Sequence, residues 1–407
     1  MDVELSPRAA SVPAANKQPT TTASGYALPP GRRDMLDAKG RLMLKSLTRP
    51  ELEAWAVSLG ETANRALQLW RWMYADGCWV GDLQDTAGVQ GGVSQKFIDQ
   101  VSGQASADGG LQLLDVAKSK DGTRKLAFKL TQGAATGGTV ETVLIPVVRE
   151  AGQRNRITIC VSSQVGCAMN CQFCYTGRMG LLGNLTAAQI VEQVVAARRY
   201  MALEGDDTPL TNLVFMGMGE PLHNADAVCA AIAIMTDHLG LHMSHNKITV
   251  STVGLVPEIR AFAAAGTRAQ LAVSLHATTD EALTELFPRG NEEGRSVLIE
   301  YLMLAGINDT EGDAVRLLAL LEPIQCKVNL ILFNPHAGTR FMPSKTEDYL
   351  AFRSTLIQGG RVCTIRDSRG DDEMAACGQL GDVTAAFRPS PLLPPPPSLA
   401  HLLQPAA

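Results

Sequence analysis

From about residue 157 onward, the chain alternates between short apolar runs rich in β-branched residues and longer segments with helical periodicity. The apolar runs are ITICV, LTNLVFMGM, NKITVS, QLAVSLH, VLIEYLML, KVNLILFN and RVCTIR. The helical segments that separate most of them are residues 186–203, 224–239, 256–265, 309–322 and 346–358. Strands buried on both faces that alternate with helices are typical of a parallel sheet. Six or seven such units predict an α/β fold built on a barrel, which need not be complete.

A smaller helical unit precedes this region. Apolar residues recur at helical intervals through residues 47–77, namely Leu52, Trp55, Leu59, Leu67, Trp70 and Met73, and a glycine follows them. Two strand-like runs, RKLAFKL and VETVLIPVV, come next.

The pattern divides the chain into five segments. We predict a disordered segment at 1–38, a helical domain at 39–105, a short β segment at 106–152, an α/β core at 153–384 and a disordered Pro-rich tail at 385–407. The two ends are assigned to disorder because they are rich in Ala, Pro, Ser and Thr and show no hydrophobic period.

The composition supports a substantial core but provides no overall charge that would attract a polyanion. Of the 407 residues, 45% are hydrophobic and 19% are charged, and the formal net charge is −5. Contact with RNA would therefore need a local basic patch. The candidates are residues 124–129, residues 154–156, Arg198, Arg199, Arg361, Arg366 and Arg369. No apolar run approaches the ~18 residues of a transmembrane helix, so we expect no membrane association.

The cysteine count bears on the compartment. Nine cysteines, an odd number, in a long chain without a visible secretory signal argue against a disulfide-stabilised secreted protein. We therefore expect a cytoplasmic protein. The Arg, Ser and Thr content of residues 1–38 leaves a plastid transit peptide as the alternative, against which Asp2 and Glu4 weigh.

Four of the nine cysteines lie within CVSSQVGCAMNCQFC, residues 160–174, and Cys167, Cys171 and Cys174 have the spacing C-x3-C-x2-C. Randomly placed cysteines would produce such a triplet only about 0.004 times in this chain. A disulfide framework, a zinc site and an iron–sulfur cluster are the three candidate explanations. Structural zinc needs four ligands, and no His or Cys follows at a suitable spacing. Three thiolates on a cubane cluster leave one iron open to an exchangeable ligand, so we favour an iron–sulfur cluster.

Polar residues and glycines recur where the predicted strands end, which is where parallel barrels carry their active sites. These residues are Gly219 and Glu220 in GMGEP, then Ser251, Ser274, His276 and Asn334. Any one of them alone is more often a satisfied turn residue than a ligand. Their recurrence at one end of successive strands predicts a shared pocket.

These motifs resemble a known family. The cysteine triplet after a first strand, with Phe173 before the last cysteine, resembles the radical S-adenosylmethionine superfamily. The segments CVSSQVGCAMNCQFC, GNLTAAQIVEQV, FMGMGEPLHN, STVGLVP, SLHA, FNP and RGDDEMAACGQL resemble, in order, the RlmN-type adenine-C2 RNA methyltransferases. This resemblance, which runs from about residue 47 to 384, implies a partial (β/α)6-type barrel with a small N-terminal helical RNA-binding domain and flexible tails.

The resemblance also implies cofactors and their ligands. It implies one [4Fe-4S] cluster held by Cys167, Cys171 and Cys174, with S-adenosylmethionine bound at the open iron. It assigns Gly219 and Glu220 to the methionine amine. Contacts to ribose, carboxylate and adenine then fall to Ser251, Ser274, His276 and Asn334.

Three further residues receive chemical roles from the resemblance: Cys377, Cys160 and Glu141. Adenine C2 is electron-poor, so ordinary nucleophilic methyl transfer fails there. In the family, one S-adenosylmethionine methylates the cysteine matching Cys377, and a radical from a second takes a hydrogen from that methyl group. The resulting carbon adds to C2, the base matching Glu141 removes the C2 proton, and the sulfur matching Cys160 releases the RNA by forming a disulfide with Cys377.

The expected partners follow from this chemistry. They are large-subunit rRNA and certain tRNAs, an electron donor such as flavodoxin or ferredoxin, and a thiol reductant, with the protein acting as a monomer. One alternative is a C8-adenine methyltransferase of the same architecture. A radical enzyme acting on a non-RNA substrate and a non-catalytic metal or thiol-redox module are others. Hydrogen abstraction from a small substrate needs neither Cys160 nor Cys377, which favours the RNA methyltransferase.

Overall fold

A computed structural model of the protein describes residues 21–22, 26–29, 32, 35–149, 153–276 and 297–381. The predicted Pro-rich tail and most of residues 1–38 lie outside the described residues.

The described strands are β1 (Leu42–Met43), β2 (Ala105–Ser106), β3 (Leu111–Lys118), β4 (Arg124–Leu130), β5 (Thr139–Val147), β6 (Arg156–Cys160), β7 (Gln164–Cys167), β8 (Gly180–Asn184), β9 (Leu210–Phe215), β10 (Ile248–Thr252), β11 (Gln270–Ser274), β12 (Val297–Met303), β13 (Cys326–Leu332) and β14 (Val362–Arg366). The described α-helices are α1 (Arg49–Ser58), α2 (Ala63–Tyr74), α3 (Gln95–Val101), α4 (Tyr175–Arg178), α5 (Ala187–Leu203), α6 (Ala225–Thr236), α7 (Val256–Ala264), α9 (Glu311–Leu321) and α10 (Thr346–Gln358). Short 3-10 turns occur at η1 (Leu44–Ser46), η2 (Leu83–Thr86), η3 (Pro221–Asn224), η4 (His245–Lys247) and η5 (Asp371–Glu373).

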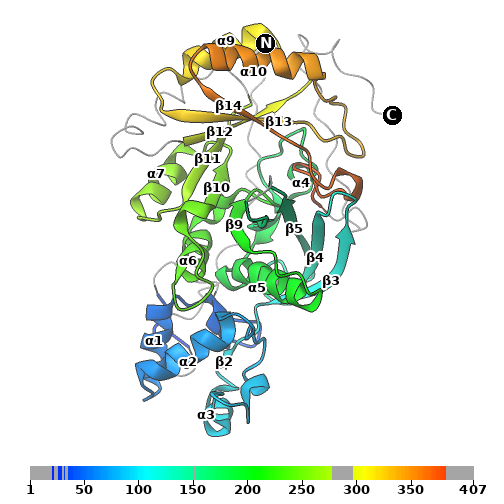
Figure 1. The fold of residues 1–407 in the computed structure, drawn as a ribbon. Helices are drawn as coiled ribbons and strands as arrows, with labels where there is room; N and C mark the ends of the chain where they lie inside the picture. The colour runs from blue at the N-terminus through cyan, green and yellow to red at the C-terminus, as the bar shows by residue number, and fades with distance from the viewer. Residues whose placement is uncertain are drawn as a thin grey trace, which may run out of the picture.

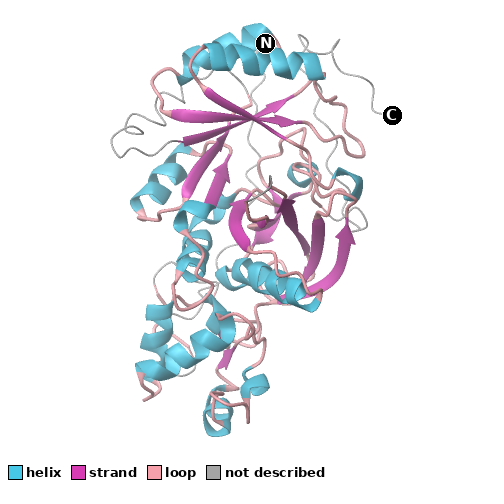
Figure 2. Ribbon diagram, in the orientation of Figure 1, coloured by secondary structure: helices cyan, strands magenta, loops and turns pink. Residues whose placement is uncertain are grey.

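One ten-stranded sheet with the order β14-β13-β12-β11-β10-β9-β6-β5-β4-β3 organises the described chain (Figures 1 and 2). Its pairs from β6 through β14 are parallel, whereas β3, β4, β5 and β6 pair antiparallel. Among the described strands the sheet does not close, since β14 and β3 are its two edges. The predicted α/β fold with an incomplete barrel is confirmed.

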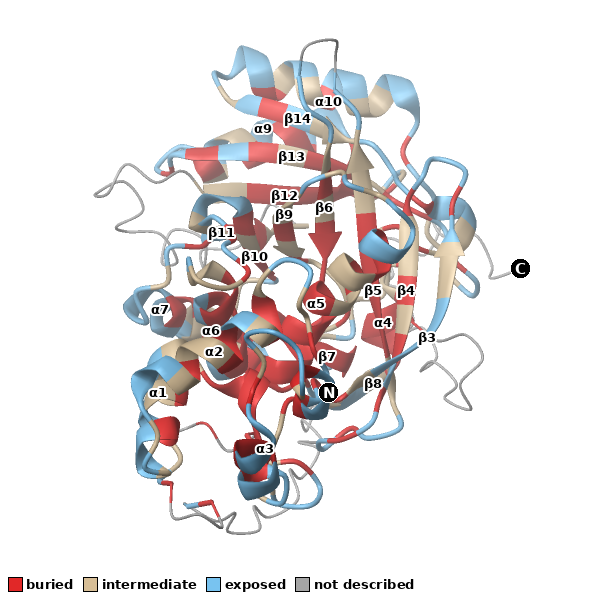
Figure 3. Ribbon diagram, turned by 60° about the horizontal axis from the view of Figure 1, so that its bottom comes forward, coloured by how far each residue is buried: buried red, intermediate tan, exposed pale blue. Residues whose placement is uncertain are grey.

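The core strands and helices lie close to where the hydrophobic pattern predicts them. Strands β12 to β14 pack under α9 and α10 around a cluster that includes Tyr301, Leu317 and Phe352 (Figure 1). Strands β12 and β13 are largely buried, the edge strand β14 is partly exposed, and the outer faces of α9 and α10 are exposed (Figure 3). These β-branched runs form parallel strands because helices shield them on the outside.

The strands of residues 106–152 lie in the same sheet as the core. Strand β5 pairs with β6, placing Val143 opposite Cys160. The antiparallel strands β3 to β5 therefore extend the barrel wall beside its first parallel strand. Strand β3 and the hairpin β7–β8 are not among the strands that the sequence pattern predicts.

The segment of residues 47–77, with its apolar residues at helical intervals, forms two helices, α1 and α2. They are separated at Gly60, whose φ of +80° favours glycine. Thr48 and Glu51 form a capping box at the start of α1. Trp55 and Trp70 from the two helices are fully buried.

Ion pairs hold this N-terminal region on the core. The Lys45 ammonium donates to Glu192 of α5 at 2.6 Å, and both side chains are buried. Arg49 of α1 pairs with Asp237 just after α6, at 2.9 Å. The hydrophobic cluster is continuous across the same boundary, because it includes α2 residues as well as α5 residues.

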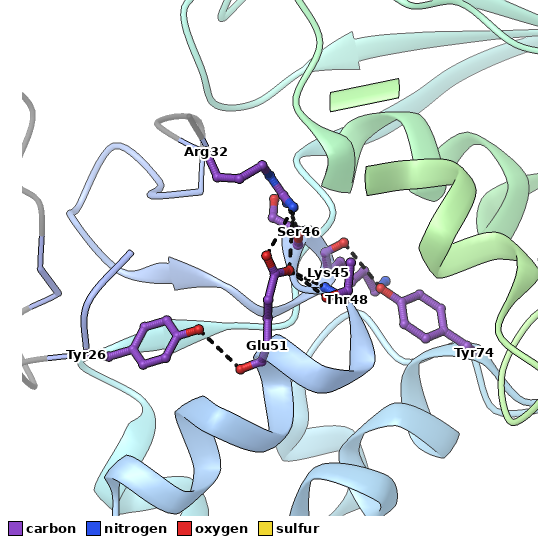
Figure 4. A network of polar contacts seen from close by, with 7 residues as sticks. All are labelled: Tyr26, Arg32, Lys45, Ser46, Thr48, Glu51 and Tyr74. Carbon is purple, nitrogen blue, oxygen red and sulfur yellow. Dashed lines mark hydrogen bonds and ion pairs between the residues drawn. The ribbon is translucent and has the colours of Figure 1, made fainter. Parts of the chain in front are cut away.

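Part of residues 21–38, for which the sequence predicts disorder, packs against α1 (Figure 4). Tyr26 donates its hydroxyl hydrogen to the Glu51 carbonyl at 3.2 Å. Arg32 pairs with the Glu51 carboxylate at 3.5 Å and donates to the Ser46 carbonyl. Tyr26 and Met35 join the hydrophobic core. The prediction differs here because isolated apolar and charged anchors in a polar segment leave no periodic signal.

Several arginines of the predicted RNA-facing patch make contacts within the protein. Arg124 pairs with Asp206 at 2.7 Å and Arg198 with Asp76 at 3.0 Å. Arg361 donates to the carbonyl of Ile324. Within the described residues, no helix has both the length and the apolar character needed to span a membrane.

Candidate active site

A pocket lies at the C-terminal ends of the central strands. Among its lining residues are Cys167, Cys171, Cys174, Gly219, Glu220, Ser251, Ser274, His276 and Cys377. The structure thus brings together the predicted site residues from the cysteine loop and three strand ends. Cys160, Asn334 and Glu141 are the predicted residues that do not line this pocket.

The three clustered cysteines lie on one short loop that joins β7 to α4. Cys167 ends β7, and Cys174 stands directly before α4 with its N–H donating to the Cys171 carbonyl at 3.0 Å. Gly177 keeps the loop tight, since a Cβ there would lie 2.9 Å from the Cys171 nitrogen. All three thiols are free.

Burial raises the pKa of the Cys167 thiol to about 11 and that of Cys171 to about 12. Thiols of this kind stay protonated at neutral pH unless a cation is bound nearby. Among the described side chains, no group of three or more His, Cys, Asp or Glu is placed to hold a metal ion. Three thiols on one pocket wall are the type of donor that an iron–sulfur cluster takes, and their assignment as its ligands stays a prediction.

Glu220 is fixed where β9 runs into η3. One carboxylate oxygen accepts the Leu222 N–H at 3.1 Å and the other accepts the Val253 N–H at 3.0 Å. Burial raises the pKa of this carboxyl, and the two amide donors oppose that shift. Glu220 therefore ties the end of β9 to the loop after β10 and presents its charge to the pocket.

Gly219 lets the backbone approach the start of β7 closely. Its φ is +102°, and a Cβ at this position would lie 2.6 Å from the Gln164 Cβ. A left-handed backbone with no space for a side chain requires glycine. The amide group of Gln164 accepts the Glu220 N–H at 2.8 Å, which fixes the turn.

His276 has a defined tautomer. Its Nδ1 accepts the Leu302 N–H at 3.1 Å, so the proton of the neutral ring is on Nε2. Burial lowers the pKa of His276 to about 4, and the ring packs edge-on against Phe173 at 5.0 Å between centroids. The Oγ atoms of Ser251 and Ser274, from neighbouring strands, lie 3.3 Å apart. Neutral donors and acceptors of this kind can bind a polar ligand without adding charge.

A second pocket occupies the concave interior of the sheet. Its lining includes Cys160, Asn212, Thr249, Glu300, Asn329, Asn334, Arg366 and Cys377. Five residues line both pockets: Met216, Glu300, Ile331, Cys377 and Leu380. Cys377 is therefore in the wall between the two spaces.

The loop that carries Cys377 is held by segments distant in the sequence. The Tyr175 N–H donates to the Gly378 carbonyl at 2.8 Å, next to the cysteine cluster. The amide group of Asn334 donates to the Cys377 carbonyl at 3.2 Å. Asn334 thus lies in the second pocket and positions the Cys377 loop.

Glu141 on β5 lies beside the same loop. Its carboxylate accepts the Gly381 N–H at 2.7 Å and pairs with the Lys125 ammonium at 3.1 Å. Lys125 also donates to the Met374 carbonyl at 3.3 Å. Glu141 is buried and lines neither pocket, so the structure places it next to Cys377's loop but behind the pocket walls.

Cys160 ends β6 and is almost fully buried. Burial raises the pKa of its thiol to about 12, while the positive charge of Arg366 opposes the shift. Burial likewise raises the pKa of Cys377 to about 11, again against Arg366. Both sulfurs therefore share one cavity and one nearby cation.

Sequence reasoning missed Glu300 and placed Arg366 on an RNA-facing surface. Glu300 is buried on β12, and its carboxylate lies 3.7 Å from Arg366 and accepts from Asn329 at 3.3 Å. A charged residue in the middle of the apolar run VLIEYLML was the available signal. Buried strands rarely contain an unpaired acid, so such a residue indicates a partner or a function.

Comparisons with known proteins extend these observations. The Radical SAM superfamily matches residues 161–318, and the ribosomal RNA large subunit methyltransferase N-terminal domain matches residues 42–83. The chain is 40% identical over 378 residues to the dual-specificity RNA methyltransferase RlmN of Phenylobacterium zucineum (strain HLK1), covering 87% of this chain and 94% of the relative. It is 40% identical over 354 residues to RlmN of Syntrophobacter fumaroxidans (strain DSM 10017 / MPOB), covering 83% and 97%.

A solved structure gives the same picture. The crystal structure of a radical SAM methyltransferase from Sphaerobacter thermophilus superposes with a TM-score of 0.72 and 36% sequence identity. The match covers 83% of this chain and 98% of that chain.

Proposed function

We propose that this chain, which belongs to the RlmN family of dual-specificity RNA methyltransferases, methylates C2 of an adenine in large-subunit rRNA and in certain tRNAs. It is a radical S-adenosylmethionine enzyme, which implies a [4Fe-4S] cluster and the use of S-adenosylmethionine. The proposal adds the position on the base, the RNA class and the part played by each residue.

The observation that carries the proposal is that Cys377 lines both pockets. A sulfur that accepts a methyl group from a cofactor and passes it to a base must reach both. The first pocket has the cysteine triplet and the strand-end residues. The second is a cavity lined by both apolar and polar side chains, which can take a base withdrawn from its stack.

When bound, the cluster and S-adenosylmethionine supply a methyl group and a carbon-centred radical, two equivalents of S-adenosylmethionine being used per methylation. Cys377 accepts the methyl group on its sulfur and, after hydrogen removal, carries the carbon that joins C2. Asn334 and the Gly378 carbonyl contact hold that sulfur between the pockets. Exclusion of water by the buried walls protects the reactive carbon.

Proton removal and release fall to two further residues. The resemblance assigns removal of the C2 proton to Glu141, whose bond to the Gly381 N–H keeps the carboxylate beside the Cys377 loop. Because Glu141 lines neither pocket, this role requires the Cys377 loop to move and open the wall between the carboxylate and the base. The adduct must also lose its unpaired electron, for which the oxidised cluster would be the acceptor. The Cys160 thiolate then attacks the Cys377 sulfur, and the sulfur–carbon bond of the adduct breaks. The electron pair stays on the carbon, which is protonated to a methyl group, while the two sulfurs are oxidised to a disulfide. An external thiol reduces that disulfide, and flavodoxin or ferredoxin supplies the electron for radical formation.

Mass spectrometry of protein isolated anaerobically with its iron tests the proposal, with Cys377→Ala as the control. We expect a tryptic peptide in which Cys377 has gained one CH2 unit, absent from the variant. Nucleoside analysis of rRNA fragments and tRNA incubated with the enzyme should give 2-methyladenosine. 8-Methyladenosine would instead assign the C8 reaction, and an unmodified Cys377 in a protein that cleaves S-adenosylmethionine would indicate a non-RNA substrate.

A further inference from the structure

The two sulfurs of the second pocket share a guanidinium whose placement the proposed chemistry leaves unexplained. Arg366 ends β14 and reaches into the cavity that Cys160 and Cys377 line. Its Nη1 lies 3.2 Å from the Met216 sulfur and 3.7 Å from Glu300. Within the part of the chain that the structure describes, these are its polar contacts, so its remaining donors are not committed to the protein.

Glu300 is engaged on its other side. Asn329 donates to it at 3.3 Å, and Thr364 donates to Asn329 at 2.8 Å. The three residues stand in one row across β12, β13 and β14, as the strand registers show. This row holds the carboxylate still, while Arg366 at 3.7 Å is only loosely paired. Because the carboxylate only partly neutralises the guanidinium at this distance, the positive charge can still stabilise other anionic groups in the cavity.

The Cys160 thiolate needs a nearby positive charge of this kind. Only a thiolate attacks sulfur, and the 5% exposed Cys160 lies where burial disfavours the charged form. Its neighbours across the sheet, Val143 on β5 and Val214 on β9, are uncharged. The charged or titratable groups that act on it are Arg366 from β14, Glu300 from β12 and Cys377.

We propose that Arg366 is a positioning residue for the release step: its charge stabilises the Cys160 thiolate, and the charge of Glu300 opposes it. This inference rests on the proposed function, because it assigns Cys160 to the attack on Cys377. The two members of the pair act with opposite sign: the guanidinium favours the thiolate and the carboxylate disfavours it. A role confined to packing would give no such opposition.

The experiment measures alkylation of Cys160 by iodoacetamide, followed by mass spectrometry of its peptide, in the anaerobic full-length holoprotein between pH 7 and 9. All variants carry Cys377→Ala, so that no disulfide forms. Below the pKa of a thiol, its alkylation rate follows the thiolate fraction. Losing a nearby positive charge typically raises the pKa of a thiol by about one unit or more. The thiolate fraction, and with it the alkylation rate, then falls about tenfold or more.

We expect Arg366→Met to slow Cys160 alkylation about tenfold at each pH, Arg366→Lys to restore part of the rate and Glu300→Gln to raise it. Arg353→Met is the matched control. Arg353 lies on α10 and donates to the Cys363 carbonyl, and its charge opposes the rise that burial causes in the pKa of the Cys363 thiol rather than in that of Cys160. This variant should leave the Cys160 rate unchanged. Equal rates in Arg366→Met and the parent, or a change of the same sign in Arg366→Met and Glu300→Gln, would overturn the inference.

The result is separable from the fate of the proposed function, since no RNA is present. The expected pattern of rates in a protein that methylates no RNA would reject the proposed function alone. If the protein methylates RNA but its Cys160 alkylation rate is the same with and without the charges of Arg366 and Glu300, only the role of Arg366 is rejected. A variant that fails to fold is recognised from its iron content and circular dichroism, and the Glu300→Gln arm then decides the question by its sign.

Discussion

The ion pair between Lys45 and Glu192 allows a quantitative test of how the N-terminal region is held on the core. The Lys45 side chain is 0% exposed and that of Glu192 is 6% exposed. Truncating Lys45 to methionine keeps most of the apolar stem but leaves the carboxylate without its closest partner. Removing one member of a buried pair costs about 3–5 kcal/mol.

The structure places this case at the low end of that range. Arg199 lies 3.6 Å from the other oxygen of Glu192 and continues to offset its charge. We therefore expect Lys45→Met to lower the free energy of unfolding by about 3 kcal/mol. In Lys45→Met/Glu192→Gln the buried charge is gone and only amide desolvation remains, so the loss should shrink to about 1–2 kcal/mol.

Urea denaturation under anaerobic conditions measures these values, monitored by tryptophan fluorescence and circular dichroism. Both probes should report one transition, because Trp55 and Trp70 belong to the cluster that also contains the α5 residues. Lys118→Met is the control: Lys118 pairs with Glu204 at the surface, with side chains 56% and 42% exposed, so its loss should have little effect on the free energy of unfolding. The reasoning is refuted if Lys45→Met costs no more than Lys118→Met, or if the double variant is as unstable as the single one.

Three further outcomes are expected. Because the pKa of His276 is about 4 in the fold and 6.5 unperturbed, the unfolded chain binds more protons between these values, so His276 should contribute a loss of about 2 kcal/mol as pH falls from 8 to 5. His276→Asn should flatten this part of the stability curve, and an unchanged slope would contradict the burial argument. Glu220→Gln retains one good acceptor where the structure has two, so we expect at least about tenfold weaker S-adenosylmethionine binding by calorimetry, with Glu258→Gln on α7 unaffected. Cys171→Ser should abolish iron incorporation, measured by iron and sulfide analysis, whereas Cys229→Ser should retain it; a fully loaded Cys171→Ser protein would exclude Cys171 as a ligand.

The sequence predicts the parallel strands and their helices well because doubly buried strands produce unbroken apolar runs. It misses β3, whose exposed face carries Leu113 and Leu114 without a regular alternation. It also misses the packing of Tyr26 and Arg32 on α1, since two anchors in a polar segment do not form a period. Where tertiary contacts replace local pattern, no window of sequence contains the signal.

The candidate site shows the same division. The sequence predicts that the cysteine loop and the strand ends form one site, because the carboxyl ends of parallel strands lie at the same edge of a sheet. That Cys377 separates two pockets, and that Arg366 is inside the barrel rather than on an RNA-facing surface, depends on how a loop folds back across the sheet. The role of Glu141 was assigned through resemblance, and only the structure reveals its bond to Gly381.

The loop that carries Cys377 has a consequence for the timing of biosynthesis. Gly381 bonds to Glu141 across 240 residues, and Gly370 bonds to Asp121 across 249. At typical translation rates those partners leave the ribosome roughly half a minute apart. During that interval the nascent chain already contains the cysteines proposed to hold the cluster but lacks Cys377, the residue proposed to receive a methyl group. If Cys377 has the role proposed for it, a chain that has not yet been translated to residue 377 cannot begin the reaction.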